Sequence, residues 1–453
     1  MTRRLAQLPS TIACSGCGTV VEADEPYPFR CPQAGDGRDH VLRRLLDYDE
    51  LDFPLGAEAA AERQPFVRYR SLLHSYHLAR AGGLSDSDYV ALVGRLDGAV
   101  AKVDGRGFVA TPLRGEGRLA EAAGLGEGLL VKDETGNPAG SHKGRHLFGV
   151  LVHLEVVEMI GLVDPANRPP LAIASCGNAA LAAAVVAAAG GRRLLVFVPT
   201  DADPAVLERL GELGAEVTVC PREPGRTGDP TYHRLQASIA EGALPFTCQG
   251  NENGLAVEGG ETIGYEMISA LGGTAAPLDA VVVQVGGGAL ASAVAASFFE
   301  AVELGVLERA PRFHTVQTEA AWPLRRAFLR VEQAVGSPAT PAAVRAALHD
   351  AAAHRSSFMW PWEEVPHSIA HGILDDETYD WLAVTEAMLL TRGRPAVVSE
   401  EELSEANALA RDATGIAVDP TGSAGLAGLL HLVGDGTIGL GERVAVLFTG
   451  AQR

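Results

Sequence analysis

Short apolar runs alternate with longer helical stretches from about residue 168 onward. Strands are predicted at residues 171–174, 194–199 and 216–220, and helices at residues 178–189, 204–213 and near 231–241. Short apolar runs are typical of strands that are covered on both faces, and the intervening helices provide the cover. The pattern therefore predicts an open α/β domain with a parallel sheet, about a hundred residues in size.

Further strands are predicted outside that domain. Residues 278–285 form an apolar run that leads into three glycines and an alanine-rich helix, and residues 443–448 form another. Residues 145–160 have helical periodicity. Residues 332–365 contain several prolines and alanines and are expected to be the least regular part of the chain.

Length, composition and charge disfavour several classes of protein. With 453 residues, of which 47% are hydrophobic, the chain can bury more than one core. A formal charge of −20 disfavours nucleic acid or an anionic membrane as a partner. The apolar run at residues 179–189 is too short to span a bilayer, and no apolar segment follows the first four residues. We expect a soluble, cytoplasmic protein.

The first 60 residues differ from the rest. They contain Cys14-x-x-Cys17, a Pro-Tyr-Pro turn and an acidic run at residues 47–51. Six cysteines in the whole chain are too few and too scattered for a disulfide framework. A small N-terminal module is therefore predicted, with free thiols and one candidate metal site.

Residues 132–145 are predicted to form a turn-rich loop that delivers Lys143 to the start of a helix. Gly136, Pro138 and Gly140 interrupt regular structure before the helical periodicity begins. A partly desolvated lysine at such a place can act as a nucleophile and carry a proton. An ordinary solvated lysine on a surface loop is the alternative interpretation.

Two further turns lie between a predicted strand and a predicted helix. The first is Ser175-Cys176-Gly177-Asn178, where unpaired backbone N–H groups can bind a carboxylate, or where Ser175 or Asn178 simply caps the helix. The second is Gly286-Gly287-Gly288-Ala289-Leu290, where the backbone can approach a phosphate, or where the glycines only make a tight turn. The spacing does not match a nucleotide-binding motif.

The last candidate lies at the end of the chain. Residues 419–425 open a helix of small residues, and Thr449 follows the last predicted strand. Its hydroxyl can hydrogen-bond a ligand, or it can be an ordinary threonine at a strand end.

Taken together and in this order, these elements resemble the fold-type II family of pyridoxal phosphate enzymes, most closely threonine synthases and their relatives. Further matches at residues 253–262, 368–370 and 398–402 spread the resemblance over about residues 105–453. The resemblance implies that Lys143 carries pyridoxal 5'-phosphate as a Schiff base. It also implies that Asn178 faces the phenolic oxygen, that residues 286–290 hold the phosphate, and that Thr449 contacts the pyridine nitrogen.

The resemblance also implies an architecture. It is an α/β fold similar to tryptophan synthase β chains, with two open parallel-sheet domains and a small N-terminal module. The expected divisions are residues 1–60 for the zinc-ribbon-like module, residues 61–165 with 263–453 for the large cofactor-binding domain, and residues 166–262 for the small domain. A homodimer is expected.

The implied chemistry is elimination or replacement at the β or γ carbon of an L-amino acid. The residues expected to contact substrate are Ser141, Arg145, Ser175, Cys176, Gly177 and Asn178. Arg145, with Lys132 and Ser141, is expected to bind an anionic leaving group such as phosphate, although Arg145 can instead pair with an acidic neighbour.

The sequence leaves open other reactions and other classes of protein. Ala179 stands where enzymes that use phosphohomoserine commonly have a hydroxyl residue, which leaves open a serine/threonine dehydratase-like ammonia-lyase or a cysteine/cysteate synthase-like replacement enzyme. From other classes, the alternatives are a regulatory relative without turnover, which the presence of Lys143 disfavours, and a nucleotide-dependent oxidoreductase.

Several threonine synthase relatives begin with a zinc-ribbon-like segment. Here Cys14, Cys17 and Cys31 supply three thiolates, and the fourth cysteine expected near position 34 is missing. His40, or else Asp36 or Asp39, is then required to complete a tetrahedral zinc site. A metal-free turn is the alternative.

Overall fold

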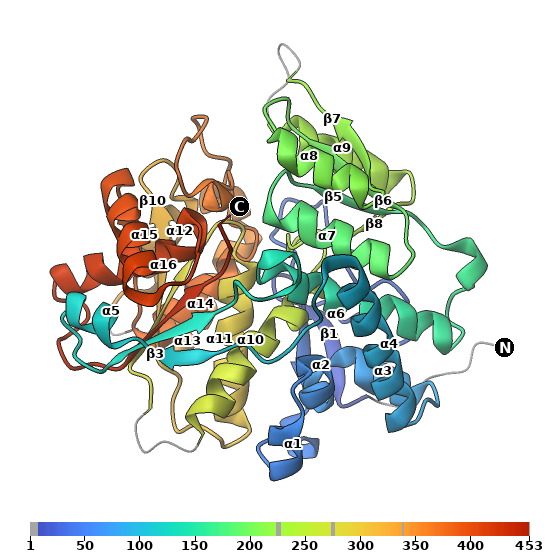
Figure 1. Ribbon diagram of the computed structural model, residues 1–453, viewed down its shortest axis with the longest axis horizontal. Coiled ribbons are helices and arrows are strands. Elements are labelled where there is room, and N and C mark those ends of the chain that lie inside the picture. The colour runs from blue at the N-terminus through green and yellow to red at the C-terminus, as the bar shows by residue number, and fades with distance from the viewer. Residues whose placement is uncertain (1–7, 223–227, 273–276, 338, 453) are drawn as a thin grey trace.

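The computed structural model describes residues 8–222, 228–272, 277–337 and 339–452, which form three sheets surrounded by helices (Figure 1). An antiparallel pair near the N-terminus consists of β1 (Ser10–Cys14) and β2 (Leu42–Leu46). The two larger sheets have four and six strands.

The four-stranded sheet has the order β7-β6-β5-β8, and all of its strands are parallel. Its strands are β5 (Leu171–Ala174), β6 (Leu194–Val198), β7 (Glu216–Val219) and β8 (Leu244–Pro245). The associated helices are α7 (Asn178–Ala189), α8 (Pro204–Glu212) and α9 (Pro230–Ala240). The predicted parallel α/β unit is confirmed, and each predicted element is present within about two residues.

The six-stranded sheet has the order β11-β10-β9-β12-β4-β3, in which only β3 is antiparallel to its neighbour. Its strands are β3 (Leu113–Gly115), β4 (Leu129–Asp133), β9 (Ala280–Gln284), β10 (Arg312–Thr318), β11 (Pro395–Val398) and β12 (Val444–Phe448). Every residue of β9 and β12 is buried, which explains why both strands are continuous apolar runs in the sequence.

Helices lie on both faces of this six-stranded sheet. They are α5 (Gly117–Ala122), α10 (Ala256–Leu271), α11 (Ala289–Glu303), α12 (Pro323–Val335), α13 (Pro341–Ala353), α14 (Trp381–Thr391), α15 (Glu400–Thr414) and α16 (Pro420–Gly434). The expectation that residues 332–365 are the least regular part is wrong, because α13 occupies much of that stretch. Pro341 begins this helix, and the Thr340 hydroxyl caps it by accepting from the Ala343 N–H at 3.2 Å.

The N-terminal hairpin leads into a group of short helices. These are α1 (Ala57–Ala61), α2 (Pro65–Arg68), α3 (His74–Ala81) and the longer α4 (Asp86–Asp104). Single 3₁₀ turns lie at Tyr48–Glu50, Arg70–Leu72, Pro138–Gly140, Pro165–Asn167, Arg355–Ser357 and His371–Ile373. No helix in the described ranges is both long and apolar enough to cross a membrane.

Helix α6 (Lys143–Met159) lies at the centre of the molecule (Figure 1). It is buried along most of its length and packs against α3, α7 and α10. Its closest approach to α10 needs glycine, because a Cβ atom on Gly259 would lie 2.2 Å from the Arg145 carbonyl oxygen. Helix α10 also runs through residues 262 and 263, so the expected limit between the small and large domains falls inside one helix.

The contact between α6 and α10 gives a test of this packing. Gly259→Ala should lower the free energy of unfolding by about 1–3 kcal/mol, because the two helices must separate to admit the methyl group. Gly94→Ala, at an exposed position of α4 with open space around it, is the matched control and should raise stability by roughly 0.5–1 kcal/mol. Denaturant unfolding of both variants measures the difference. Equal effects would contradict the tight helix crossing.

Candidate active site

A loop between β4 and α6 presents Lys143. The chain turns sharply at Ala139 and Gly140, which have φ angles of 57° and 64°, and Lys143 is the first residue of α6. Lys143 is half-buried, whereas His142 and Gly144 on either side are buried. The prediction that a turn-rich loop delivers this lysine to a helix start is confirmed.

The end of β12 holds this loop in place. The His142 backbone N–H donates to the Thr449 carbonyl at 3.1 Å, and the Ala451 N–H donates to the Gly140 carbonyl at 2.8 Å. The His142 ring nitrogen Nδ1 lies 3.1 Å from the same Thr449 carbonyl. Burial, together with the charge of Lys143, holds the pKa of His142 well below its ordinary value. A neutral imidazole therefore lies between Lys143 and the last strand.

The turn Ser175–Asn178 approaches the same place from the four-stranded sheet. All four residues are half-buried, and Asn178 is the first residue of α7. Its side-chain nitrogen lies 3.4 Å from a carboxylate oxygen of Asp419, and a Cβ atom on Gly450 would be 2.9 Å from that nitrogen. The first turn of α7 thus faces the strand end that carries Thr449, and its backbone N–H groups can bind an anion.

The glycine loop lies between β9 and α11, as predicted. Gly288 has a φ angle of 99° and precedes α11 directly. The segment Asp375–Asp380 lies against this loop: the Thr378 hydroxyl donates to the Gly286 carbonyl and the Asp380 N–H donates to the Gly287 carbonyl, each at 3.0 Å. A Cβ atom on Gly286 would lie 2.2 Å from a carboxylate oxygen of Asp375. Side chains are therefore excluded from the loop.

The Asp375 carboxylate lies against the glycine loop. It accepts a hydrogen bond from the Gly287 backbone N–H. Burial raises the pKa of Asp375 to about 6, against the attraction of the Lys143 ammonium. The sequence interpretation missed this residue, although the acidic pair Asp375–Asp376 follows closely after the matched residues 368–370.

Thr449 is 2% exposed and has a defined hydrogen-bond partner. Its hydroxyl oxygen accepts from the Gln284 side-chain nitrogen at 2.7 Å, and Gln284 also donates to the Gly422 carbonyl at 2.8 Å. Because the hydroxyl accepts this bond, its own proton is available to a ring nitrogen. Gln284 was not predicted, and its signal in the sequence is a polar residue that ends an apolar strand.

Arg145 and Lys132 do not face a substrate. Both are completely buried, and Arg145 contacts Glu134 at 2.8 Å and Glu266 at 2.7 Å. Lys132 donates to Glu266 and, at 2.6 Å, to the Thr111 hydroxyl. The expectation that Arg145 and Lys132 bind an anionic leaving group is therefore wrong, and the alternative pairing with acidic neighbours is confirmed. The reason is helical geometry: two residues correspond to about 200° of rotation, so Arg145 points away from Lys143.

Ser141 differs from these two residues. It is buried and forms a bridge with Gly450, and its hydroxyl has no hydrogen-bond partner among the described residues. Its role toward a substrate stays a prediction.

The N-terminal hairpin brings together the four predicted metal ligands. The ligand atoms of Cys14, Cys17, Cys31 and His40 all lie within 4.8 Å of one another. His40 Nδ1 is 3.6 Å from the Cys14 sulfur, while its Nε2 is 2.8 Å from Asp36. Asp39 pairs with Arg355 and Trp381 instead. Of the three candidates for the fourth ligand, His40 is the one in place, and Asp36 can orient its ring.

The buried ion network gives a prediction for stability. Arg145→Ala should cost about 3–5 kcal/mol, because Glu134 and Glu266 would remain buried without their main partner. Arg193→Ala, which breaks the exposed pair with Glu216, is the matched control and should have a much smaller effect, because water screens this pair. Chemical denaturation of both variants measures these losses. A similar small cost for both would contradict a structural role for Arg145.

The same network predicts a pH dependence. Burial acts to raise the pKa of Glu266, but Arg145 and Lys132 outweigh it and hold that pKa below its ordinary value. The pairing of Glu266 therefore adds stability that is fully present above the pKa of this group in the unfolded chain. This stability is lost as the pH falls from there through the lower pKa of the folded state, so the free energy of unfolding should decrease at acid pH.

Comparison with known proteins agrees with this geometry. A family model described as pyridoxal-phosphate dependent enzyme matches residues 106–450. The threonine synthase of Methanocaldococcus jannaschii is 25% identical over 442 residues, which cover 96% of this chain and 91% of that protein. The threonine synthase of Methanosarcina acetivorans is 28% identical over 356 residues, which cover 75% of this chain and 74% of that protein.

Solved structures are similar in fold. Threonine deaminase isoform 2 of Solanum lycopersicum has a TM-score of 0.57 and 18% identity, covering 82% of this chain and 91% of that one. Diaminopropionate ammonia lyase of Escherichia coli has a TM-score of 0.58 and 15% identity, covering 81% and 89%. The predicted α/β architecture is thus confirmed. Because the family model covers most of the chain, this protein belongs to the pyridoxal phosphate-dependent enzymes, with the fold-type II architecture.

Proposed function

We propose that this protein is a threonine synthase-like enzyme that labilises a β or γ substituent of an L-amino acid at a site built around Lys143. The observation that carries the proposal is the position of Lys143, half-buried at the start of α6 beside the end of β12. The full-length similarity to threonine synthases supports the same reaction class.

The small number of lysines in the chain limits which residue can bind the cofactor covalently. The chain has three lysines: Lys102, Lys132 and Lys143. Lys102 is exposed on α4, and Lys132 is buried in an ion pair with Glu266. Lys143 is the one that lies beside both a neutral histidine and the Thr449 strand end, so it is the residue that we assign to covalent attachment of the cofactor.

The remaining loops fit the rest of the cofactor. The backbone N–H groups of residues 286–290 would hold its phosphate at the start of α11, where Asp375 now accepts a hydrogen bond and would have to give way. Thr449 would donate to the ring nitrogen, and Asn178 would donate to the ring oxygen. When bound, pyridoxal phosphate stores the electron pair that is released when a substrate loses its Cα proton.

The protein itself would position the substrate and move the proton. The N–H groups of Ser175, Cys176, Gly177 and Asn178 at the start of α7 would bind the α-carboxylate and fix the direction of the Cα–H bond. Lys143 Nζ would accept that proton and return it. A neutral hydroxyl partner at Thr449 leaves the ring less electron-withdrawing than a carboxylate would, which favours elimination and replacement over transamination.

One observation favours the ammonia-lyase alternative as a second candidate. Lys132 and Arg145 are both engaged in buried ion pairs, so the expected support for a phosphate leaving group is missing. Asp375 instead places a carboxylate close to the glycine loop. Assays of phosphate release from a phosphorylated hydroxy amino acid, and of ammonia release from serine, threonine and a diamino acid, separate the two candidates.

Reduction with borohydride tests the attachment site. It should fix one cofactor per chain on the peptide that contains Lys143, and Lys143→Ala should abolish turnover, because the group that moves the Cα proton is removed. Lys102→Ala is the matched control and should retain cofactor and activity. Peptide mapping by mass spectrometry gives the result. Cofactor fixed on Lys102 or Lys132 would contradict the assignment.

We also propose one structural zinc ion held by Cys14, Cys17, Cys31 and His40. Burial opposes the charged form of Cys17, but hydrogen bonds with the side chain and backbone of Thr19 lower the pKa of this thiol to about 6, which favours the thiolate that binds metal ions. Three sulfurs and one imidazole nitrogen form a ligand set that is typical of closed structural zinc sites.

Elemental analysis tests the metal. Native protein should contain about one zinc per chain, the stoichiometry of a single structural site. Cys31→Ser should lose the metal and unfold at lower temperature, whereas Cys220→Ser, at a cysteine far from the cluster in sequence, should keep it. Native protein with far less than one zinc per chain would favour the metal-free turn.

We further propose that the enzyme is a cytoplasmic homodimer. Family resemblance supports this assignment, and sedimentation or light scattering measures the assembly.

A further inference from the structure

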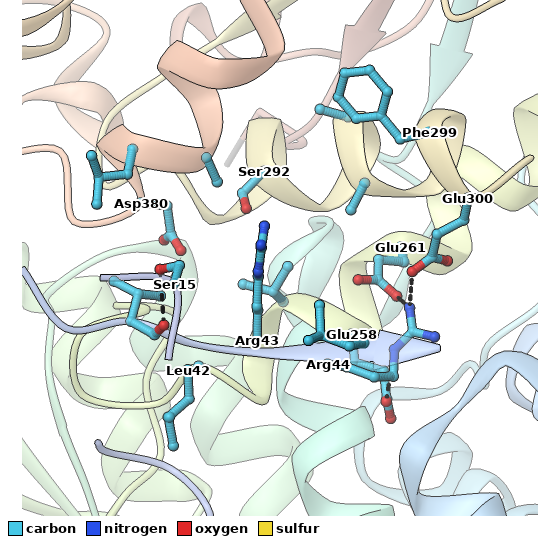
Figure 2. A pocket seen from close by; sticks show the side chains of 18 of the residues that line it. Ser15, Leu42, Arg43, Arg44, Glu258, Glu261, Ser292, Phe299, Glu300 and Asp380 are labelled. Atoms are coloured by element: carbon cyan, nitrogen blue, oxygen red, sulfur yellow. Dashed lines mark hydrogen bonds and ion pairs between the residues drawn. The ribbon is translucent and has the colours of Figure 1, made fainter. Parts of the chain in front are cut away.

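A buried ionic cluster anchors the N-terminal hairpin to the helices behind the glycine loop (Figure 2). The guanidinium of Arg44, in β2, lies 3.3 Å from Glu258 and 2.7 Å from Glu300, and it also contacts Glu261. Glu258 and Glu261 belong to α10, and Glu300 belongs to α11, the helix that begins directly after the glycine loop. Since buried charges are stable only when their partners are in place, the cluster fixes β2 relative to both helices.

Asp39 lies shortly before β2 and is 3% exposed. Its backbone N–H donates to the Ala352 carbonyl, in the last turn of α13, at 2.8 Å. A Cβ atom on Gly16, in the turn between Cys14 and Cys17, would lie 1.8 Å from the Asp39 carbonyl oxygen. The backbone of Asp39 is therefore held between this turn and α13, and the position of its carboxylate is determined by both.

The Asp39 carboxylate holds both ends of one short segment, residues 377–381. Its Oδ1 atom accepts from the Trp381 indole N–H at 2.9 Å and from the Arg355 Nε at 3.1 Å. Arg355 also donates to the Glu377 carboxylate at 2.6 Å. Trp381 is completely buried and is the first residue of α14. One carboxylate thus binds the end of the segment directly and its beginning through Arg355.

The middle of this segment lies on the glycine loop. The Thr378 hydroxyl donates to the Gly286 carbonyl, and the Asp380 backbone N–H donates to the Gly287 carbonyl, each at 3.0 Å. A trans peptide unit is planar, so a fixed carbonyl also fixes the N–H of the next residue. The segment therefore sets the direction of the Gly287 and Gly288 N–H groups.

We propose that Asp39 is a positioning residue for the cofactor phosphate. It acts through Trp381 and Arg355 on the segment that orients the N–H groups of the glycine loop. The inference rests on the proposed function in one respect, the assignment of residues 286–290 to the phosphate. N–H groups that are already oriented bind an anion more tightly than mobile ones, because binding does not have to order them.

A comparison of pyridoxal phosphate with pyridoxal, which lacks the phosphate, tests the proposal on protein freed of cofactor. The absorbance of the bound compound gives a dissociation constant for each, and the ratio of the two constants measures the contribution of the phosphate. Asp39→Ala should lower the affinity for pyridoxal phosphate about tenfold and leave the affinity for pyridoxal unchanged. Asp39→Asn should lose less, because its amide oxygen can still accept from the Trp381 indole.

Asp279→Ala is the matched control. Asp279 directly precedes β9, at the end of this strand opposite the glycine loop, and its carboxylate accepts from the Arg443 N–H at 2.9 Å. The variant removes the same atoms as Asp39→Ala and should bind both compounds as the wild type does. Melting curves show that each variant is folded at the temperature of the titration.

The two compounds separate the possible failures. An equal loss of affinity for both in Asp39→Ala, or a wild-type ratio in both Asp39 variants, would overturn the role of Asp39 and leave the proposed function intact. Wild-type protein that binds pyridoxal as tightly as pyridoxal phosphate would show that the glycine loop does not hold the phosphate. That result would overturn the assignment of the loop together with this proposal.

Discussion

The buried pairing of Arg145 and Lys132 with Glu134 and Glu266 determines where the lysine loop lies. The four charges come from the end of β4, the loop after it, the first turn of α6 and the middle of α10. Burying charges is favourable only when every partner is in place. The network therefore fixes the start of α6 relative to both the large sheet and α10, and Lys143 is the residue at that start.

The end of β12 then joins the other parts of the site. Its residue Thr449 accepts hydrogen bonds from His142 in the lysine loop and from Gln284 next to the glycine loop, and Gly450 lies against Asn178 of the turn before α7. Three helix starts thus lie around one strand end. Anion-binding N–H groups and a lysine are brought together by backbone contacts, which hold with little dependence on the side chains that face a substrate.

Much of this could be predicted from the sequence, because the signals are local. Apolar runs gave the strands of the four-stranded sheet, and strand-turn-helix spacing located Lys143, Asn178 and the three glycines. The pairing of Arg145 with Glu266 could not be predicted, because the two residues are 121 positions apart and no local pattern in either segment indicates the other as its partner. The helix at Pro341–Ala353 was missed because the prolines of the surrounding stretch suggested irregular structure, whereas Pro341 begins the helix.

The central claim is that Lys143 moves the Cα proton of an amino acid held at the start of α7. Nuclear magnetic resonance in deuterated water measures this step directly, as exchange of the Cα proton of an L-amino acid, whether or not a leaving group departs. The account predicts exchange with wild-type protein and its loss in Lys143→Ala loaded with cofactor. Exchange at the same rate in both proteins would show that another group moves the proton, and would contradict the account.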